Sequence, residues 1–265
     1  MNARVRSLLR KELIEVSRHK TALLPIVLVG AYCMLLAFVL TVVVPRVTGE
    51  KLSEDADFAK ISLAAGAYPE LSADARVQTY FFQQFLLVFL IIPVSVAMTA
   101  AAHAIVGEKD ARTLEPLLAT PLTTAELLIA KVLGALLPAV IVTVPGLLLY
   151  LGSIAALAEP GVLATMITWR SAAAVGLLGP GLSLIALQLT VLFASRVQNE
   201  DTARQLAILG LLPFGGLVVA QFTGRLWISA AGFALCGLVL LAAWLLLLAL
   251  SVAAFDRDRI LTRWR

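Results

Sequence analysis

Six long apolar runs, separated by shorter polar segments, dominate the pattern of the chain. Each run has roughly the 20 residues that an α-helix needs to cross the hydrocarbon core of a bilayer. Helices are the expected form, because an isolated strand would leave its backbone polar groups unsatisfied in lipid. The pattern predicts an all-α polytopic membrane protein with six transmembrane helices. The expected spans are residues 21–44, 80–106, 126–151, 171–194, 204–223 and 229–254.

The fifth apolar run is interrupted by Pro213, Gly215 and Gly216. These residues predict either a kinked span or a short re-entrant turn, because proline removes a helical hydrogen bond and glycine weakens a helix. The kinked span is favoured, since little chain remains before the sixth run.

The segment before the first span, residues 1–20, has an amphipathic pattern. Apolar residues recur at helical spacing, and most charged residues fall elsewhere on the helical wheel. The apolar positions are Val5, Leu8, Leu9, Leu13 and Val16. This pattern predicts an interfacial helix, with cations near the lipid phosphates, that includes Arg10, Lys11, Glu12 and Leu13. The alternative is a basic flank that only sets the topology.

The largest polar segment, residues 45–79, is predicted to be an outer loop. It is too short and too poor in apolar residues to form a stable domain by itself. Its acidic residues lack the spacing of a calcium-binding loop, which favours a solvated surface. Ser72 is expected to cap a helix that runs through Ala73 into the second span.

Composition supports the membrane interpretation. Apolar residues make up 60% of the chain, charged residues only 14%, and the mean hydropathy is +0.94. A soluble domain has about 25% charged residues, so this chain has too little polar surface to cover a water-soluble globule. The net charge of +4 does not indicate a nucleic-acid partner, because the basic residues flank apolar runs. Membrane lipid is the expected partner.

The distribution of Lys and Arg predicts the orientation, since these residues favour cytoplasmic loops. With the N-terminus in the cytoplasm, fifteen basic residues fall on the cytoplasmic side and six on the outer side by direct count. The outer six are Arg46, Lys51, Lys60, Arg76, Arg170 and Arg225. Both termini, including the basic tail 255–265, are therefore expected to be cytoplasmic. The expected location of the protein is the plasma membrane.

Chemistry-bearing motifs are missing from the sequence. No Lys follows a Gly, which excludes the phosphate-binding G-x-x-x-x-G-K-[ST] loop, and neither G-x-S-x-G nor H-E-x-x-H occurs. We therefore expect no catalytic residue, no metal and no cofactor in this chain, which is not predicted to be an enzyme. Gln83, Gln84 and Gln188 are polar exceptions inside spans. They either form interhelical hydrogen bonds, the favoured interpretation, or line a path.

A charged island between the second and third spans, residues 107–123, is the most distinctive segment. Glu108 and Arg112 are four residues apart and can pair on a helix surface. A leucine patch follows at helical spacing, and Pro121 ends the element. The patch consists of Leu114, Leu117 and Leu118. Thr123 and Glu126 then form a T-x-x-E capping box that starts the third span.

The island therefore combines a short helix, a stop and a capped restart. A charged rim around a leucine patch can dock into the groove of a partner protein. The alternative is a loop that folds onto its own bundle.

The sequence of residues 107–131 resembles the cytoplasmic signature of type-2 ATP-binding-cassette exporter permeases. The matching positions are Glu108, Lys109, Asp110, Thr113, Leu114, Glu115, Leu117, Leu118, Thr120, Pro121, Glu126, Leu127 and Lys131. Arg112 stands where the family usually has Gly, and Pro116 where it commonly has a helix former. The Lys11-Glu12-Leu13 triplet is similar to part of the family's N-terminal elbow helix.

The resemblance implies a function. The chain would be the permease subunit of an ATP-driven exporter, and the island would contact a separate ATPase that binds ATP-Mg. The implied assembly contains two ATPase copies and a homodimer or heterodimer of permeases. An ion-coupled carrier or channel without an ATPase, and a non-transporting membrane scaffold, are the alternatives that the residues alone leave open.

Overall fold

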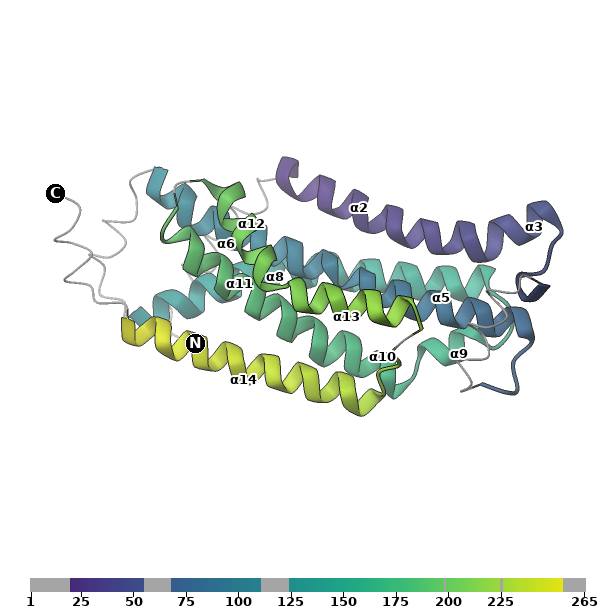
Figure 1. The fold of residues 1–265 in the computed structure, drawn as a ribbon. Coiled ribbons are helices and arrows are strands. Elements are labelled where there is room, and N and C mark those ends of the chain that lie inside the picture. The colour runs from purple at the N-terminus through teal and green to yellow at the C-terminus, as the bar shows by residue number, and fades with distance from the viewer. Residues whose placement is uncertain (1–19, 55–67, 111–123, 198, 225, 255–265) are drawn as a thin grey trace.

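The computed structural model describes residues 20–54, 68–110, 124–197, 199–224 and 226–254. All regular secondary structure in these ranges is helical, and the helices form one elongated bundle (Figure 1). Five helical stretches are long and apolar enough to cross a membrane. They are Ile26–Thr48, Ala73–Val106, Lys131–Leu157, Trp169–Ala194 and Ala230–Leu250.

Helices α5 (Ala73–Phe89) and α6 (Ile91–Asp110) run almost continuously and form the axis of the bundle. In the 18-residue apolar window of this stretch, 83% of the residues are buried, the largest share among the candidate spans. Ser72 begins α5, because its hydroxyl accepts a hydrogen bond from the amide of Ala75 at 3.1 Å. This confirms the predicted cap and the predicted start of the helix, which precedes the expected span at residue 80.

The other long helices surround this axis. Helix α2 (Lys20–Phe38) continues through a π-helical turn, Val39–Val43, into α3 (Val44–Thr48). Helix α8 (Thr124–Leu157) and helix α11 (Gly179–Ala194) pack on α6, and α14 (Ala230–Ala254) packs on α11. Figure 1 shows α2 and α14 on opposite edges of the bundle. Short helices α9 (Val162–Met166) and α10 (Trp169–Ala173) connect α8 to α11.

The small residues Ala97, Ala101 and Ala104 of α6 are all buried within the chain. Ala97 and Ala101 belong to a core that includes Val132 and Ala135 of α8. Their small side chains allow the helix axes to approach closely. These alanines therefore serve packing inside one subunit.

The fifth apolar run forms two helices, α12 (Glu200–Gly210) and α13 (Leu212–Phe222), with a 55° bend between them. The break is at Leu211, and Pro213 lies in the first turn of α13, where its missing amide hydrogen is tolerated. The expected break at Pro213, Gly215 and Gly216 is therefore wrong in position. Those three residues lie inside α13.

The bent pair runs from one end of the bundle to the other. Glu200 in α12 contacts His103 near the end of α6, whereas the carbonyl of Phe222 in α13 accepts a hydrogen bond from Tyr80 near the start of α5. A re-entrant turn would return to the end at which it began. These contacts favour a kinked crossing over a re-entrant turn, and counting the pair as one span gives up to six candidate spans.

Candidate functional site

The charged island leaves the bundle where α6 ends at Asp110 and returns where α8 begins at Thr124. Residues 111–123, and the side chains of Glu108, Lys109, Asp110 and Glu126, fall outside the described part of the chain. The same holds for the interfacial residues Arg10, Lys11, Glu12 and Leu13. The range 111–123 contains seven of the predicted site residues, namely Thr113, Leu114, Glu115, Leu117, Leu118, Pro121 and Thr123. The structure therefore defines the base of the island.

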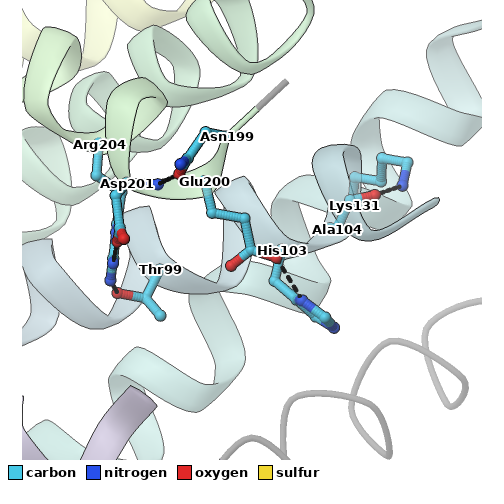
Figure 2. A network of polar contacts seen from close by, with 8 residues as sticks. All are labelled: Thr99, His103, Ala104, Lys131, Asn199, Glu200, Asp201 and Arg204. Carbon is cyan, nitrogen blue, oxygen red and sulfur yellow. Dashed lines mark hydrogen bonds and ion pairs between the residues drawn. The ribbon is translucent and has the colours of Figure 1, made fainter. Parts of the chain in front are cut away.

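Lys131 closes this base. Its ammonium group donates a 2.6 Å hydrogen bond to the carbonyl oxygen of Ala104, and only 3% of the residue is exposed (Figure 2). Burying an ammonium group is costly unless strong hydrogen bonds compensate it. The contact fixes the second turn of α8 against α6.

Helix α12 joins the same end of the bundle through charged and polar side chains. Nδ1 of His103 lies 2.9 Å from a carboxylate oxygen of Glu200 (Figure 2). Asn199 caps α12 by accepting a hydrogen bond from the amide of Asp201 at 2.8 Å. The His103–Glu200 contact positions the start of α12 beside the last turns of α6, and the Asn199 cap fixes where α12 begins.

One further polar contact lies about one helical turn deeper. Arg204 pairs with Asp201 on its own helix and donates a 3.1 Å hydrogen bond to the hydroxyl of Thr99 in α6 (Figure 2). A small apolar cluster of Val106, Ala194 and Ala203 packs beside these contacts. The ends of α6, α8, α11 and α12 are thus held together around the exit point of the island.

The sequence identified Lys131 as a motif position but did not show that it is buried. Its place in an otherwise apolar run was the one sign of burial, since a lysine there must reach either the interface or an internal acceptor. The contact between His103 and Glu200 joins residues 97 positions apart. No local pattern indicates such a pairing.

A second polar cluster lies at the opposite end of the bundle, around Arg170 of α10. Its guanidinium group donates to the side-chain oxygen of Gln83 at 2.6 Å and to the carbonyl of Ile228 at 2.8 Å. It also lies 4.1 Å from the centre of the Trp227 ring, a cation–π geometry. Arg170 therefore connects α5, α10 and the segment that leads into α14.

The span glutamines Gln83 and Gln84 make interhelical hydrogen bonds, as favoured from the sequence. Gln83 donates to the carbonyl of Thr165 at 3.3 Å, and Gln84 donates to the carbonyl of Gln221 at 3.3 Å. Tyr80 donates to the same Gln221 carbonyl at 3.1 Å. These contacts hold α9 and α13 on the central helix α5.

We expect Arg170→Leu to loosen this end of the bundle. The change leaves the side-chain oxygen of Gln83 and the carbonyl of Ile228 without their donor, and each unsatisfied group costs about 1–3 kcal/mol when buried. Because Arg170 is only partly buried, we expect a net loss of about 2 kcal/mol and a thermal midpoint lower by about 5 °C. The midpoint is measured on detergent-purified protein by fluorescence-detected size-exclusion chromatography.

Arg170→Lys tests the geometry of that contact. Lysine retains the charge but lacks the planar guanidinium group that donates to both Gln83 and Ile228. We therefore expect a thermal midpoint between those of the parent chain and Arg170→Leu. Arg196→Leu is the matched control, because Arg196 is an exposed arginine at the other end of the bundle. Equal midpoints for Arg170→Leu and the control would contradict the structural role of Arg170.

Metal and thiol chemistry have no counterpart in the described part of the chain. It contains no group of three or more His, Cys, Asp or Glu side chains that could hold a metal ion. Cys33 and Cys236 are both free and partly buried. The described residues therefore offer a polar base beside the two helix ends that residues 111–123 connect, and no cluster of metal-ligating side chains was found among them.

An all-helical bundle with several membrane-length helices defines a multi-pass membrane protein. A family model described as ABC-2 family transporter protein matches residues 6–236. The chain therefore belongs to the ABC-2 transporter family and is a membrane component of a transporter. No curated protein and no solved structure matches it.

Proposed function

We propose that this chain is the permease subunit of an ATP-driven exporter in the plasma membrane. It would cross the membrane six times, with both termini cytoplasmic and residues 1–20 forming an interfacial helix. The permease role follows from membership of the ABC-2 family, and that membership implies association with an ABC ATPase. The partner would bind ATP-Mg and hydrolyse it, and this chain would rearrange its helices in response.

The proposed assembly contains two ATPase copies and a second permease, identical or related. Residues 107–123 would contact the ATPase, with Leu114, Leu117 and Leu118 buried in a cleft on its surface. Glu108, Asp110 and Glu115 would orient the contact as rim charges. The observation that carries this proposal is the family match over residues 6–236, which includes the island.

The base of the island supports this mechanical role. A docking segment transmits force only if its attachment to the moving helices is stiff. Lys131 ties the start of α8 to α6, and Glu200 ties the start of α12 to His103 of the same helix. A push on residues 107–123 would therefore displace α6 and α8 together, with α12 following through the α6 contact.

The test replaces Leu114, Leu117 and Leu118 by Asp in the full-length chain, co-expressed with the ABC ATPase that co-purifies with the parent chain. Three carboxylates in an apolar cleft lack partners, and we expect co-purification of the ATPase to fall about tenfold or more. Measured in proteoliposomes, the permease-dependent stimulation of ATP hydrolysis is expected to fall with it.

The matched control replaces the same three leucines by Met, which conserves apolar character and volume. It should retain both ATPase binding and stimulation. If the Asp variant binds the ATPase and stimulates hydrolysis as well as the parent chain does, the docking proposal is wrong. Transport by the purified chain in vesicles without ATP would instead establish an ion-coupled carrier or channel.

A further inference from the structure

Two cavities lie next to each other along the side of α2 that faces α6 and α12. The first, of about 330 Å³, is lined by Thr99, Asp201, Arg204 and Gln205, together with apolar side chains. The second, of about 290 Å³, is lined by apolar residues that include Gly30, Cys33 and Val88. Ile26 and Ser95 line both cavities, so the two adjoin each other, and we refer to them together as the groove.

The groove is polar at one end and apolar at the other. Asp201 and Arg204 are the charged residues among those that line it, and both belong to the first cavity. Further along, the backbone of α2 at Gly30 lies directly against the side chain of Ile92, which forms the floor of the second cavity. An amphiphile lying parallel to the helices would match this division.

The polar end lies toward one end of the bundle. Ile26 is six residues after the start of α2 at Lys20, and Arg204 is in the second turn of α12. Thr99 is seven residues before the end of its candidate span at Val106, or about 10 Å at 1.5 Å per residue. A phosphate that enters the groove from this end would meet the guanidinium group of Arg204 at the level of Thr99.

The volume of the groove favours a lipid chain over a helix of a second protein. A helix about 10 Å across and 20 Å long fills about 1,500 Å³, far more than the two cavities together. Val29, Ile91 and Ile208 on the rim are more than half exposed, so the groove opens sideways to the surrounding lipid. A narrow, laterally open, apolar groove suits an acyl chain.

The charges at the polar end favour a zwitterionic headgroup. Arg204 and Asp201 together are neutral and already pair with each other (Figure 2). A phosphate can bind Arg204 while an ammonium group binds Asp201, which replaces one ion pair by two. A purely anionic headgroup would gain the contact with Arg204 but would face the carboxylate of Asp201.

We propose that this groove binds one zwitterionic phospholipid of the ethanolamine type. Its phosphate contacts Arg204, its ammonium group contacts Asp201, and one acyl chain runs past Ser95 toward Cys33 and Val88. The site is independent of the ATPase-docking proposal, because it involves α2, α6 and α12 rather than residues 107–123.

The test uses full-length protein that has been stripped of lipid in detergent and titrated with dioleoyl phosphatidylethanolamine or dioleoyl phosphatidylglycerol. Bound lipid is counted by native mass spectrometry. We expect about fivefold tighter binding of the ethanolamine lipid, the scale of a partly exposed charge contact. Asp201→Asn should abolish or reverse this preference, whereas Arg204→Gln should weaken binding of both lipids.

Ser95→Phe tests the groove without altering the charges. The larger ring fills the junction of the two cavities, so binding of both lipids should fall while their ratio is unchanged. Arg196→Gln, an exposed arginine outside the groove, is the matched control and should bind lipid as the parent chain does. The proposal is overturned by equal affinities for the two lipids in the parent chain. It is also overturned if Ser95→Phe leaves lipid binding unchanged, or disrupts a dimer without reducing lipid binding.

Discussion

Gly237→Ala is expected to destabilise the permease, although alanine is the better helix former. A Cβ atom at Gly237 of α14 would lie 2.7 Å from the backbone carbon of Leu177 and 2.8 Å from the backbone nitrogen of Leu178. Backbone atoms cannot rotate away, so the two helices must separate. Such overpacking costs about 1–3 kcal/mol, which exceeds the gain of up to about 1 kcal/mol in helix propensity.

The expected net loss for Gly237→Ala is about 1–2 kcal/mol, and Gly237→Leu should prevent α14 from docking. Helix α14 depends on this contact, because only 11% of the 18-residue apolar window of its span is buried within the chain. The measurement is the thermal midpoint of the detergent-purified protein. Gly152→Ala is the control, since a Cβ atom there meets no other atom within 4 Å and the propensity gain is unopposed. Similar midpoints for both alanine variants would contradict the close approach.

The long apolar helices could be predicted from local composition. A long apolar segment in lipid must form a helix to satisfy its backbone hydrogen bonds, so the positions of the spans follow from local hydropathy. The cap at Ser72 was equally local, because a serine side chain can satisfy an amide only a few residues away. These features require no knowledge of what the helices contact.

The break at Leu211 is a local consequence of Pro213, because proline fits the first turn of a helix and the bend falls before it. Features that depend on tertiary contact were missed. A π-helical turn, Ala174–Leu178, provides the backbone that Gly237 meets, and nothing local to either segment indicates the other. Glycine in an apolar run is compatible with many roles, and only a neighbouring helix distinguishes them.

The motif of residues 107–131 is recognisable from the sequence, whereas the contacts around it are not. Charges, leucines and a capping box occur together there, a pattern that left open a docking segment or a loop folded onto its own bundle. The contacts that fix its base involve the backbone carbonyl of Ala104 and the carboxylate of Glu200. A backbone carbonyl has no sequence signature, so the partner of Lys131 could not be inferred.

Lys131→Met is expected to loosen the base of the docking segment while leaving an apolar side chain of similar length. The change removes the ammonium donor to the carbonyl of Ala104, and a hydrogen bond from a charged group contributes about 1.5–3 kcal/mol. Local opening of the first turns of α8 should become easier by a similar amount. Hydrogen exchange of peptides covering residues 124–131 should therefore accelerate by about tenfold or more.

The same variant separates attachment from docking. Leu114, Leu117 and Leu118 are intact in Lys131→Met, so the partner ATPase should still co-purify. The permease-dependent stimulation of ATP hydrolysis should fall, because residues 107–123 would move without displacing α6 and α8. Arg196→Met removes an exposed charge and serves as the control. Unchanged exchange in residues 124–131 would show that the Lys131–Ala104 contact does not hold the base. Accelerated exchange with full stimulation would show that a stiff base is unnecessary for coupling.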